Sequence, residues 1–158
     1  MKEFSESRMM PYTAKQLYDL AIDIERYPEF VPLCKRASLS DPVPLPSGAM
    51  EYQSVLVFRY RKFGISEEFE STVTADPAQK TIVSVSDGPP FISFHAKWSF
   101  IDQGPGKSEA RIDVAYEFRS KALALFIDRA AGMAIQKLIS AWQDRAREIY
   151  GEPGGVAA

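Results

Sequence analysis

Between Leu33 and Ser120 the chain alternates apolar and polar residues in short segments, which proline, glycine and aspartate separate. A period of two places successive side chains on opposite faces of a β-strand. The pattern is clearest in one segment, where every second residue is apolar: Ile92, Phe94, Ala96, Trp98 and Phe100. The alternation therefore predicts about six strands of an antiparallel sheet with one buried face and one wetter face.

Helical spacing replaces this alternation on both sides of the sheet region. Residues Glu3 to Met10 favour a short first strand, and Thr13 with Gln16 forms a capping box that starts a helix. At the other end, Lys121 to Tyr150 gives about 30 residues without proline, roughly 45 Å of helix at 1.5 Å per residue. The order predicts an α+β fold in which a curved antiparallel sheet wraps around the C-terminal helix, with two short helices after the first strand.

A sheet that bends around one helix can leave a cavity between them. Ala130, Gly132 and Ala134 would widen it, because they withdraw side-chain volume from the middle of the helix. Close helix-sheet packing without a cavity is the alternative. If a cavity exists, we expect the following residues to line it: Phe69, Val73, Val85, Phe94, Trp98, Tyr116, Phe126 and Met133.

The stretch IERYPEFVPLCK concentrates apolar side chains where prolines end the preceding helix. Two interpretations stay open: its side chains either cap one end of the sheet or border a cavity mouth and act as a lid. The residues concerned are Tyr27, Phe30, Val31 and Pro32.

Composition narrows the class of protein. The 158 residues are 46% hydrophobic and 25% charged, which is typical of a soluble globular domain. We expect one domain over residues 1–151 and a flexible tail over 152–158. The net charge of -2 shows no basic surplus, so a DNA partner is not expected. The absence of a signal or membrane-spanning pattern favours the cytoplasm, with peripheral contact at the inner face of the cytoplasmic membrane.

Few residues could act as metal ligands or catalytic groups. His95 is the only histidine and Cys34 the only cysteine, so zinc sites and cysteine-histidine catalysis are not expected. Period-two counting places His95 on the face opposite Trp98. Glu67 shares the side of Phe69 and is the one acid that could reach a cavity. No catalytic residue is assigned.

A small basic cluster follows one of the strands and consists of Arg59, Arg61 and Lys62. A solvated hairpin explains it most simply. As a functional element it would contact anionic lipid headgroups or RNA phosphates weakly and in a salt-sensitive manner.

Several segments carry a family likeness that covers nearly the whole chain: SESRMMPYTAKQLYDLAIDIERYPEFVPLC, Asp87-Gly88-Pro89, Trp98, Phe100, Tyr116 to Ser120, and RAREIYG. They resemble the coenzyme Q-binding family of the START-like, polyketide cyclase/dehydrase superfamily, whose bacterial members are also known as ribosome association toxins. Leu33 departs from the family, which often carries tryptophan there, and Pro90 lengthens the usual turn.

The resemblance implies the helix-grip fold and three competing functions. The first is a non-enzymatic carrier or chaperone for ubiquinone or a similar isoprenoid lipid, supporting respiration or quinone synthesis, with no cofactor besides that ligand. The second is a protein that binds a ribosomal subunit and blocks subunit association. The third is an enzyme of the cyclase or dehydratase kind, for which Glu67, Tyr52 and Tyr116 are the available acid-base groups.

Overall fold

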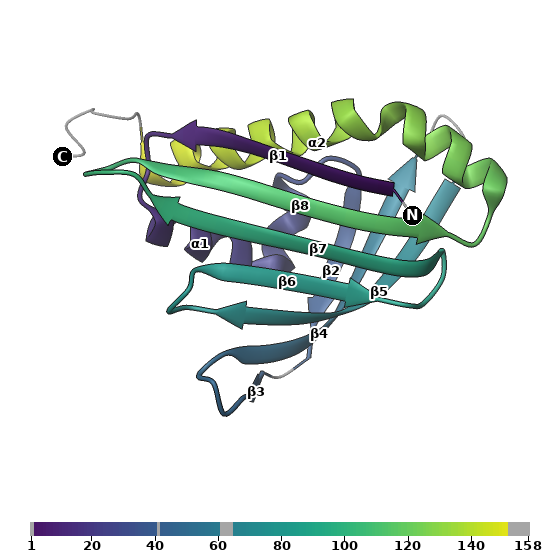
Figure 1. The fold of residues 1–158 in the computed structure, drawn as a ribbon, viewed down its shortest axis with the longest axis horizontal. Coiled ribbons are helices and arrows are strands. Elements are labelled where there is room, and N and C mark those ends of the chain that lie inside the picture. Colours follow the sequence, from purple (N-terminus) through teal and green to yellow (C-terminus); the bar gives the residue numbers. More distant parts are fainter. Residues whose placement is uncertain (1, 41, 61–64, 152–158) are drawn as a thin grey trace.

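The computed structural model describes residues 2–40, 42–60 and 65–151. Its elements follow the predicted order, with β1, two short helices, the remaining strands and a long final helix (Figure 1). Their bounds are β1 (Lys2–Met10), α1 (Ala14–Ile22), the 3₁₀-helix η1 (Ile24–Glu29), β2 (Cys34–Leu39), β3 (Val43–Pro44), β4 (Met50–Tyr60), β5 (Ile65–Asp76), β6 (Thr81–Ser86), β7 (Phe91–Asp102), β8 (Ser108–Phe118) and α2 (Lys121–Tyr150).

The described strands form one antiparallel sheet with the order β1-β8-β7-β6-β5-β4-β2, and β3 pairs with β4. Most neighbours in the sheet are consecutive in the chain, which suits hairpin connections. Two pairs are not consecutive: β2 pairs with β4, and β1 pairs with β8 from Lys2 opposite Tyr116 to Met10 opposite Ser108. The first and last strands are therefore side by side, and α2 runs along them in Figure 1. The predicted α+β fold, with a curved antiparallel sheet around a C-terminal helix, is confirmed.

The predicted capping box starts α1. Thr13 Oγ1 accepts from the Gln16 backbone N–H at 3.1 Å, and the Gln16 side chain accepts from the Thr13 N–H at 2.9 Å. The pair satisfies donors that a helix N-terminus leaves without intrahelical partners. Leu17 and Ala21 are fully buried on the inner side of this helix. α1 thus packs as a plug against one end of the sheet.

The buried face of α2 differs in part from what the sequence indicated. Its buried residues are Ala131, Ile135, Ile139, Trp142, Arg145 and Ala146. Ala130 and Gly132 are exposed, so the expectation that they widen the middle of the fold is wrong. The packed face also includes the aliphatic part of an arginine, Arg145.

Candidate ligand cavity

A cavity of about 460 Å³ lies between the inner face of the sheet, η1 and α2. This volume is within the range of about 300–1,000 Å³ for sites that hold small molecules. The described lining residues come from η1 and the segment after it, from β4 to β8 and from α2, and only Arg59 and Glu67 among them are charged. A space of this kind excludes ions and receives apolar groups.

Small side chains across the middle of the sheet make this space. Ser54 on β4 lies opposite Ser71 on β5, and Ser84 on β6 lies opposite Ala96 on β7. Ser84 also lies opposite Val73, which places it diagonally from Ser71. All four residues line the cavity. A band of small residues crosses four neighbouring strands, and the sheet therefore does not fill the space beneath α2.

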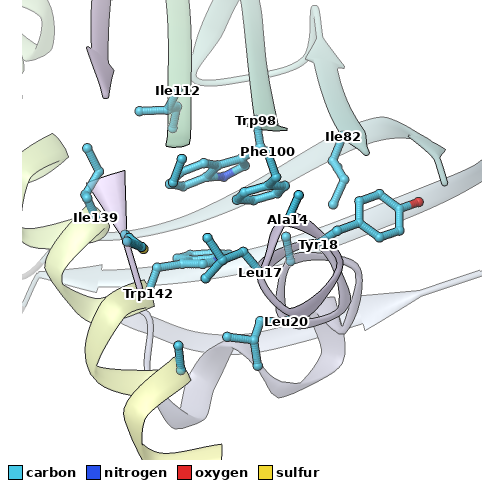
Figure 2. Close-up of a cluster of buried hydrophobic side chains, with 14 of the residues drawn as sticks. Ala14, Leu17, Tyr18, Leu20, Ile82, Trp98, Phe100, Ile112, Ile139 and Trp142 are labelled. Atoms are coloured by element: carbon cyan, nitrogen blue, oxygen red, sulfur yellow. The ribbon is translucent and has the colours of Figure 1, made fainter. Parts of the chain in front are cut away.

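Aromatic packing closes one end of the cavity. The rings of Trp98 and Trp142 lie 4.8 Å apart, and Trp98 stacks on Phe100 at 5.7 Å. Figure 2 shows Leu17 of α1 beside this group, with Ile112 above it and Ile139 at its left. Both tryptophans line the cavity as well as packing into the core. The side chains at this end of the interior are closely packed.

The opposite end reaches the surface beside the segment that follows η1. Leu33 is exposed and has a positive φ of 66°, and its carbonyl accepts from the Arg59 N–H at 3.0 Å. Arg59 and Ala134 are also exposed, and all three residues line the cavity. The mouth therefore lies between the segment 31–33, the end of β4 and the middle of α2.

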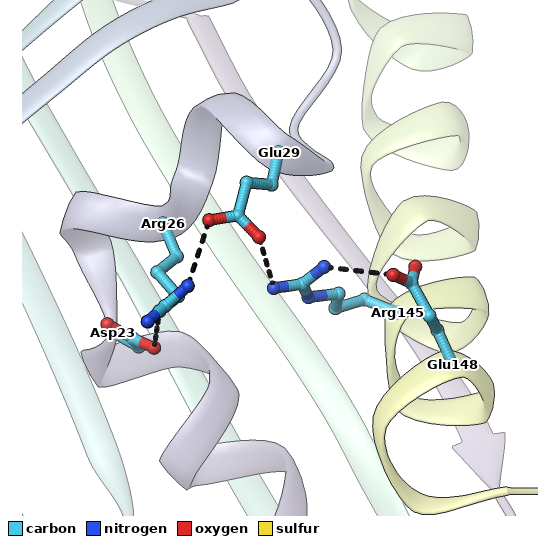
Figure 3. A network of polar contacts seen from close by, with 5 residues as sticks. All are labelled: Asp23, Arg26, Glu29, Arg145 and Glu148. Atoms are coloured by element: carbon cyan, nitrogen blue, oxygen red, sulfur yellow. Dashed lines mark hydrogen bonds and ion pairs between the residues drawn. The ribbon is translucent and has the colours of Figure 1, made fainter.

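An ion-pair network fixes η1 against α2 (Figure 3). Arg145 of α2 contacts Glu29 at 2.9 Å and Glu148 at 3.3 Å. Arg26 contacts both Glu29 and Asp23 at the outer side of η1. The Arg145 hydrogen bond lowers the pKa of the Glu29 carboxyl, and Arg26 adds to this effect. The carboxylate form of Glu29 is thus the one that holds η1 to the helix.

The structure places most of the expected lining residues on the cavity wall: Phe69, Val73, Phe94, Trp98 and Phe126, with Tyr27 and Val31 from the lid segment. Two expected residues point elsewhere. Val85 is 41% exposed because the inner residues of β6 are Ile82 and Ser84, so its predicted place is wrong. Met133 is 68% exposed on the outer side of α2, and its predicted place is also wrong.

Pro32 and Phe30 are also not part of the cavity wall. Pro32 borders a separate shallow groove that Met133 shares. The Phe30 ring packs 5.1 Å from Trp142 and lies under the Arg145 guanidinium. Both residues therefore shape the lid segment from outside the cavity.

Tyr116 is buried between β1 and α2 and is not part of the cavity wall, which corrects its predicted place. Its ring stacks with Phe4 at 6.2 Å, and its hydroxyl donates to Asp128 Oδ1 at 2.8 Å. Burial raises its pKa, and the Asp128 carboxylate raises it further. Tyr116 therefore ties α2 to the sheet and is not placed to act on a molecule in the cavity.

Glu67 is the one acid on the described cavity wall, as the alternation on β5 indicated. Tyr52, the other suggested acid-base group, is absent from the wall. Tyr27 does line the cavity, but its hydroxyl donates to the Ala21 carbonyl and burial raises its pKa. A proton-transfer role in the described part of the cavity would rest on Glu67 alone.

His95 is exposed on the outer face of β7, as predicted. Cys34 is buried, and burial raises the pKa of its thiol to about 11. In the part of the chain that the structure describes, no group of three or more His, Cys, Asp and Glu residues could hold a metal ion. Of the basic cluster, Arg59 is exposed at the mouth, while Arg61 and Lys62 lie outside the described residues, as does the tail 152–158.

Sequence reasoning missed the serines of the cavity wall. Ser54 stands in a run of inner-face positions with Tyr52 and Leu56, and Ser71 follows Phe69 at the same spacing. A small polar residue at an inner position of a strand is the signal that was available. Two small side chains opposite each other on neighbouring strands leave space in the interior unfilled.

Comparison with known proteins identifies the class. Residues 10–142 match the family described as polyketide cyclase / dehydrase and lipid transport, and the chain belongs to this family. A START superfamily protein from Mycobacterium smegmatis has the same fold, with a TM-score of 0.77 at 20% identity over 93% of this chain and 98% of that one. The Zhui aromatase/cyclase from Streptomyces superposes with a TM-score of 0.74 at 12% identity, covering 98% of each chain.

Two curated relatives match over nearly the full length. The ribosome association toxin RatA of Rickettsia prowazekii is 30% identical over 152 residues, 94% of this chain and 99% of that protein. The mitochondrial coenzyme Q-binding protein coq10 of Schizosaccharomyces pombe is 23% identical over 145 residues, 91% of this chain and 86% of that protein. Both likenesses were expected from the sequence. Within the described residues, no helix combines the length and apolar character needed to cross a membrane.

Proposed function

We propose that this protein binds an isoprenoid quinone, or a similar hydrophobic lipid, in its cavity and carries it without chemical change. The observation that supports the proposal is the enclosed apolar space of about 460 Å³ whose described charged residues are confined to Arg59 and Glu67. The name of the coq10 relative points to the same class of ligand. Such a carrier would support respiratory electron transport or quinone synthesis.

The physical basis is the cost of an isoprenoid chain in water, about 0.8 kcal/mol for each exposed CH₂ group. The cavity removes the head and the nearest part of the tail from water, and a longer tail would leave through the mouth beside Leu33. A bilayer is the natural source of such a molecule. We therefore place the protein in the cytoplasm, in transient contact with the inner face of the membrane.

A carrier needs an apolar space and an entrance but no catalytic group. Glu67 is the one described wall residue suited to general acid-base work, and it lies toward the mouth on β5. Replacement of Glu67 by Gln should therefore leave the cellular function intact. Loss of function in this variant, with unchanged folding, would favour the cyclase alternative.

The direct test is mass spectrometry of lipids that co-purify from the native host, with quenching of Trp98 and Trp142 by added quinone as the second readout. Both tryptophans line the cavity, so a bound quinone ring should quench their emission. A variant with Ala96→Phe, which fills the cavity, serves as the control and should not respond. If no lipid co-purifies and no quenching occurs, the carrier proposal fails.

Binding to a ribosomal subunit is the second candidate, because the relatives named RatA carry this activity in their name. The exposed Arg59 at the mouth is the described residue that would contact RNA phosphates. Charge reversal at Arg59 should then abolish co-sedimentation with subunits at low salt. Lys107→Glu, in the distant β7–β8 turn, is the matched control. Absence of co-sedimentation by the unaltered protein would exclude this function.

A further inference from the structure

Two buried hydroxyl groups on the cavity wall lack hydrogen-bond partners. Ser54 is 2% exposed and Ser71 is 5% exposed, and neither hydroxyl oxygen has a partner among the described residues. Buried polar groups are almost always paired, and an unpaired one is costly. The buried Ser108 shows the usual arrangement, since its hydroxyl donates to the Tyr12 carbonyl at 2.8 Å.

The two unpaired serines form one polar spot. They are direct cross-strand partners on β4 and β5, so their Cβ atoms lie about 4.5–5.5 Å apart on the same face. Both line the cavity, and rotation between staggered χ1 positions can turn each hydroxyl toward it. A third unpaired donor on the cavity wall, Trp142 Nε1, comes from α2.

This spot lies deep in the cavity. Arg59 at the mouth lies five residue steps along β4 from Ser54, about 17 Å at 3.4 Å per residue. The wall between them carries Leu56 and Phe58 on β4 and Phe69 on β5, and its one acid, Glu67, lies opposite Phe58 near the mouth. A molecule that reaches the serines therefore places one end in the interior while the other end points toward the opening.

We propose that Ser54 and Ser71 form a subsite for the polar head of the ligand, which enters first and leaves its apolar tail in the mouth. The inference rests on the proposed lipid-carrier function. The head is an uncharged group with oxygen atoms that accept hydrogen bonds, such as a carbonyl or methoxy oxygen. A carboxylate is disfavoured, because Arg59 is the one cation on the described wall and lies at the far end.

The subsite can be tested with a variant that should not damage the fold. Ser54→Ala with Ser71→Ala removes two hydroxyls that the protein does not itself use, so the unliganded protein should be as stable as before or more stable. Affinity for decylubiquinone should fall roughly tenfold, which is the effect of losing two hydrogen bonds of modest strength. A decrease in the stability of the unliganded variant would show that the hydroxyls hold structural water, and would overturn the proposal.

Ser93→Ala is the matched control. The Ser93 hydroxyl is also buried and has no partner among the described residues, but Ser93 is absent from the cavity wall. This variant should bind decylubiquinone with unchanged affinity. An equal loss of affinity in Ser93→Ala and in the double variant would overturn the assignment of the subsite.

Three probes with the same decyl chain separate the subsite from the cavity itself, with displacement of Nile red as the readout. Decylubiquinone should bind to the unaltered protein more tightly than decylbenzene or para-decylbenzoic acid. In the double variant its affinity should fall to that of decylbenzene, while the affinities of the other two probes should not change. If decylubiquinone and decylbenzene bind equally to the unaltered protein, the subsite is refuted while the apolar cavity stands. If none of the probes binds, the proposed carrier function fails as well.

Discussion

Arg145 of α2 holds Glu29, the last residue of η1, at 2.9 Å. Only 8% of the Arg145 side chain is exposed, and its guanidinium also lies 5.1 Å from the Phe30 ring. A charge so little exposed needs partners, and here they are Glu29 at the end of η1 and Glu148 on α2 itself. The pair therefore links the packing of the long helix to the position of η1 (Figure 3).

The first prediction concerns the pH dependence of this link. The pKa of Glu29 is lowered from 4.5, chiefly by its hydrogen bond with Arg145. A carboxyl whose pKa is lower in the folded state contributes stability above its unfolded pKa, and this contribution is lost as the pH falls through the folded value. Glu29→Gln should therefore reduce the free energy of unfolding at neutral pH and have no effect well below pH 4.5.

Urea denaturation at both pH values measures this difference. The same substitution in an Arg145→Met background is the control, because only Arg26 then remains as a partner and the effect of Glu29→Gln should become smaller. An unchanged effect of Glu29→Gln in that background would show that Glu29 acts through other contacts.

The second prediction tests whether the interior is hollow. Ala96 lines the cavity, whereas Ala110 is fully buried and is absent from the cavity wall. Ala110→Leu should lower the free energy of unfolding by about 1–3 kcal/mol, since extra methylenes strain a packed core. Ala96→Leu should cost less than about 0.5 kcal/mol, because its methylenes enter free space.

Thermal and urea denaturation of the two variants provide the comparison. Ala96→Leu should also weaken the binding of a hydrophobic dye, while Ala110→Leu should not. Equal destabilisation by the two substitutions would contradict a cavity at Ala96.

A third prediction concerns the attachment of α2 to the sheet. Tyr116 donates to the Asp128 carboxylate at 2.8 Å, and Tyr116→Phe removes the donor while preserving the ring. The free energy of unfolding should fall by about 1.5–3 kcal/mol, the usual contribution of a hydrogen bond to a charged group. Asp128→Asn retains an acceptor and should cost less. A loss below about 0.5 kcal/mol in Tyr116→Phe would mean that water replaces the bond.

A fourth prediction concerns the thiol at the start of β2. Burial raises the pKa of Cys34 to about 11, so the reactive thiolate is scarce at neutral pH. Alkylation by iodoacetamide should be much slower in the folded protein than in urea, and should increase as the pH approaches 11. Mass spectrometry of timed samples gives the rates. Equal rates in the folded and unfolded protein would show that the segment beside the mouth opens freely.

Much of the fold was accessible from the sequence, because periodicity reports local geometry. The alternation around Trp98 placed β7 and its inner face from Phe94 to Phe100 correctly, and the Thr13–Gln16 box placed the start of α1. The predicted inward position of Ile92 is wrong, because a register shift between Phe91 and Ser93 turns Phe91 to the cavity and leaves Ile92 exposed. The exposed position of His95 followed from the same count. Each of these predictions depends on neighbouring residues only.

The errors arose where burial depends on distant partners. On β6, Val83 and Val85 have the apolar character of a buried face, yet the face that points inward carries Ile82 and Ser84. On α2, Met133 is exposed while the smaller Ala131 is buried. Hydrophobicity ranks residues by their preference for burial. The packing of α2 and the curvature of the sheet decide which face of each element is covered.

The sequence by itself determined the order of the elements, the antiparallel sheet, the family likeness and the apolar character of the interior. Only the tertiary structure decided that Ser54, Ser71, Ser84 and Ala96 gather into one band and leave a space beneath α2. The physical reason is that alternation is a property of one strand, whereas a cavity is a volume that several strands and a helix leave unfilled together.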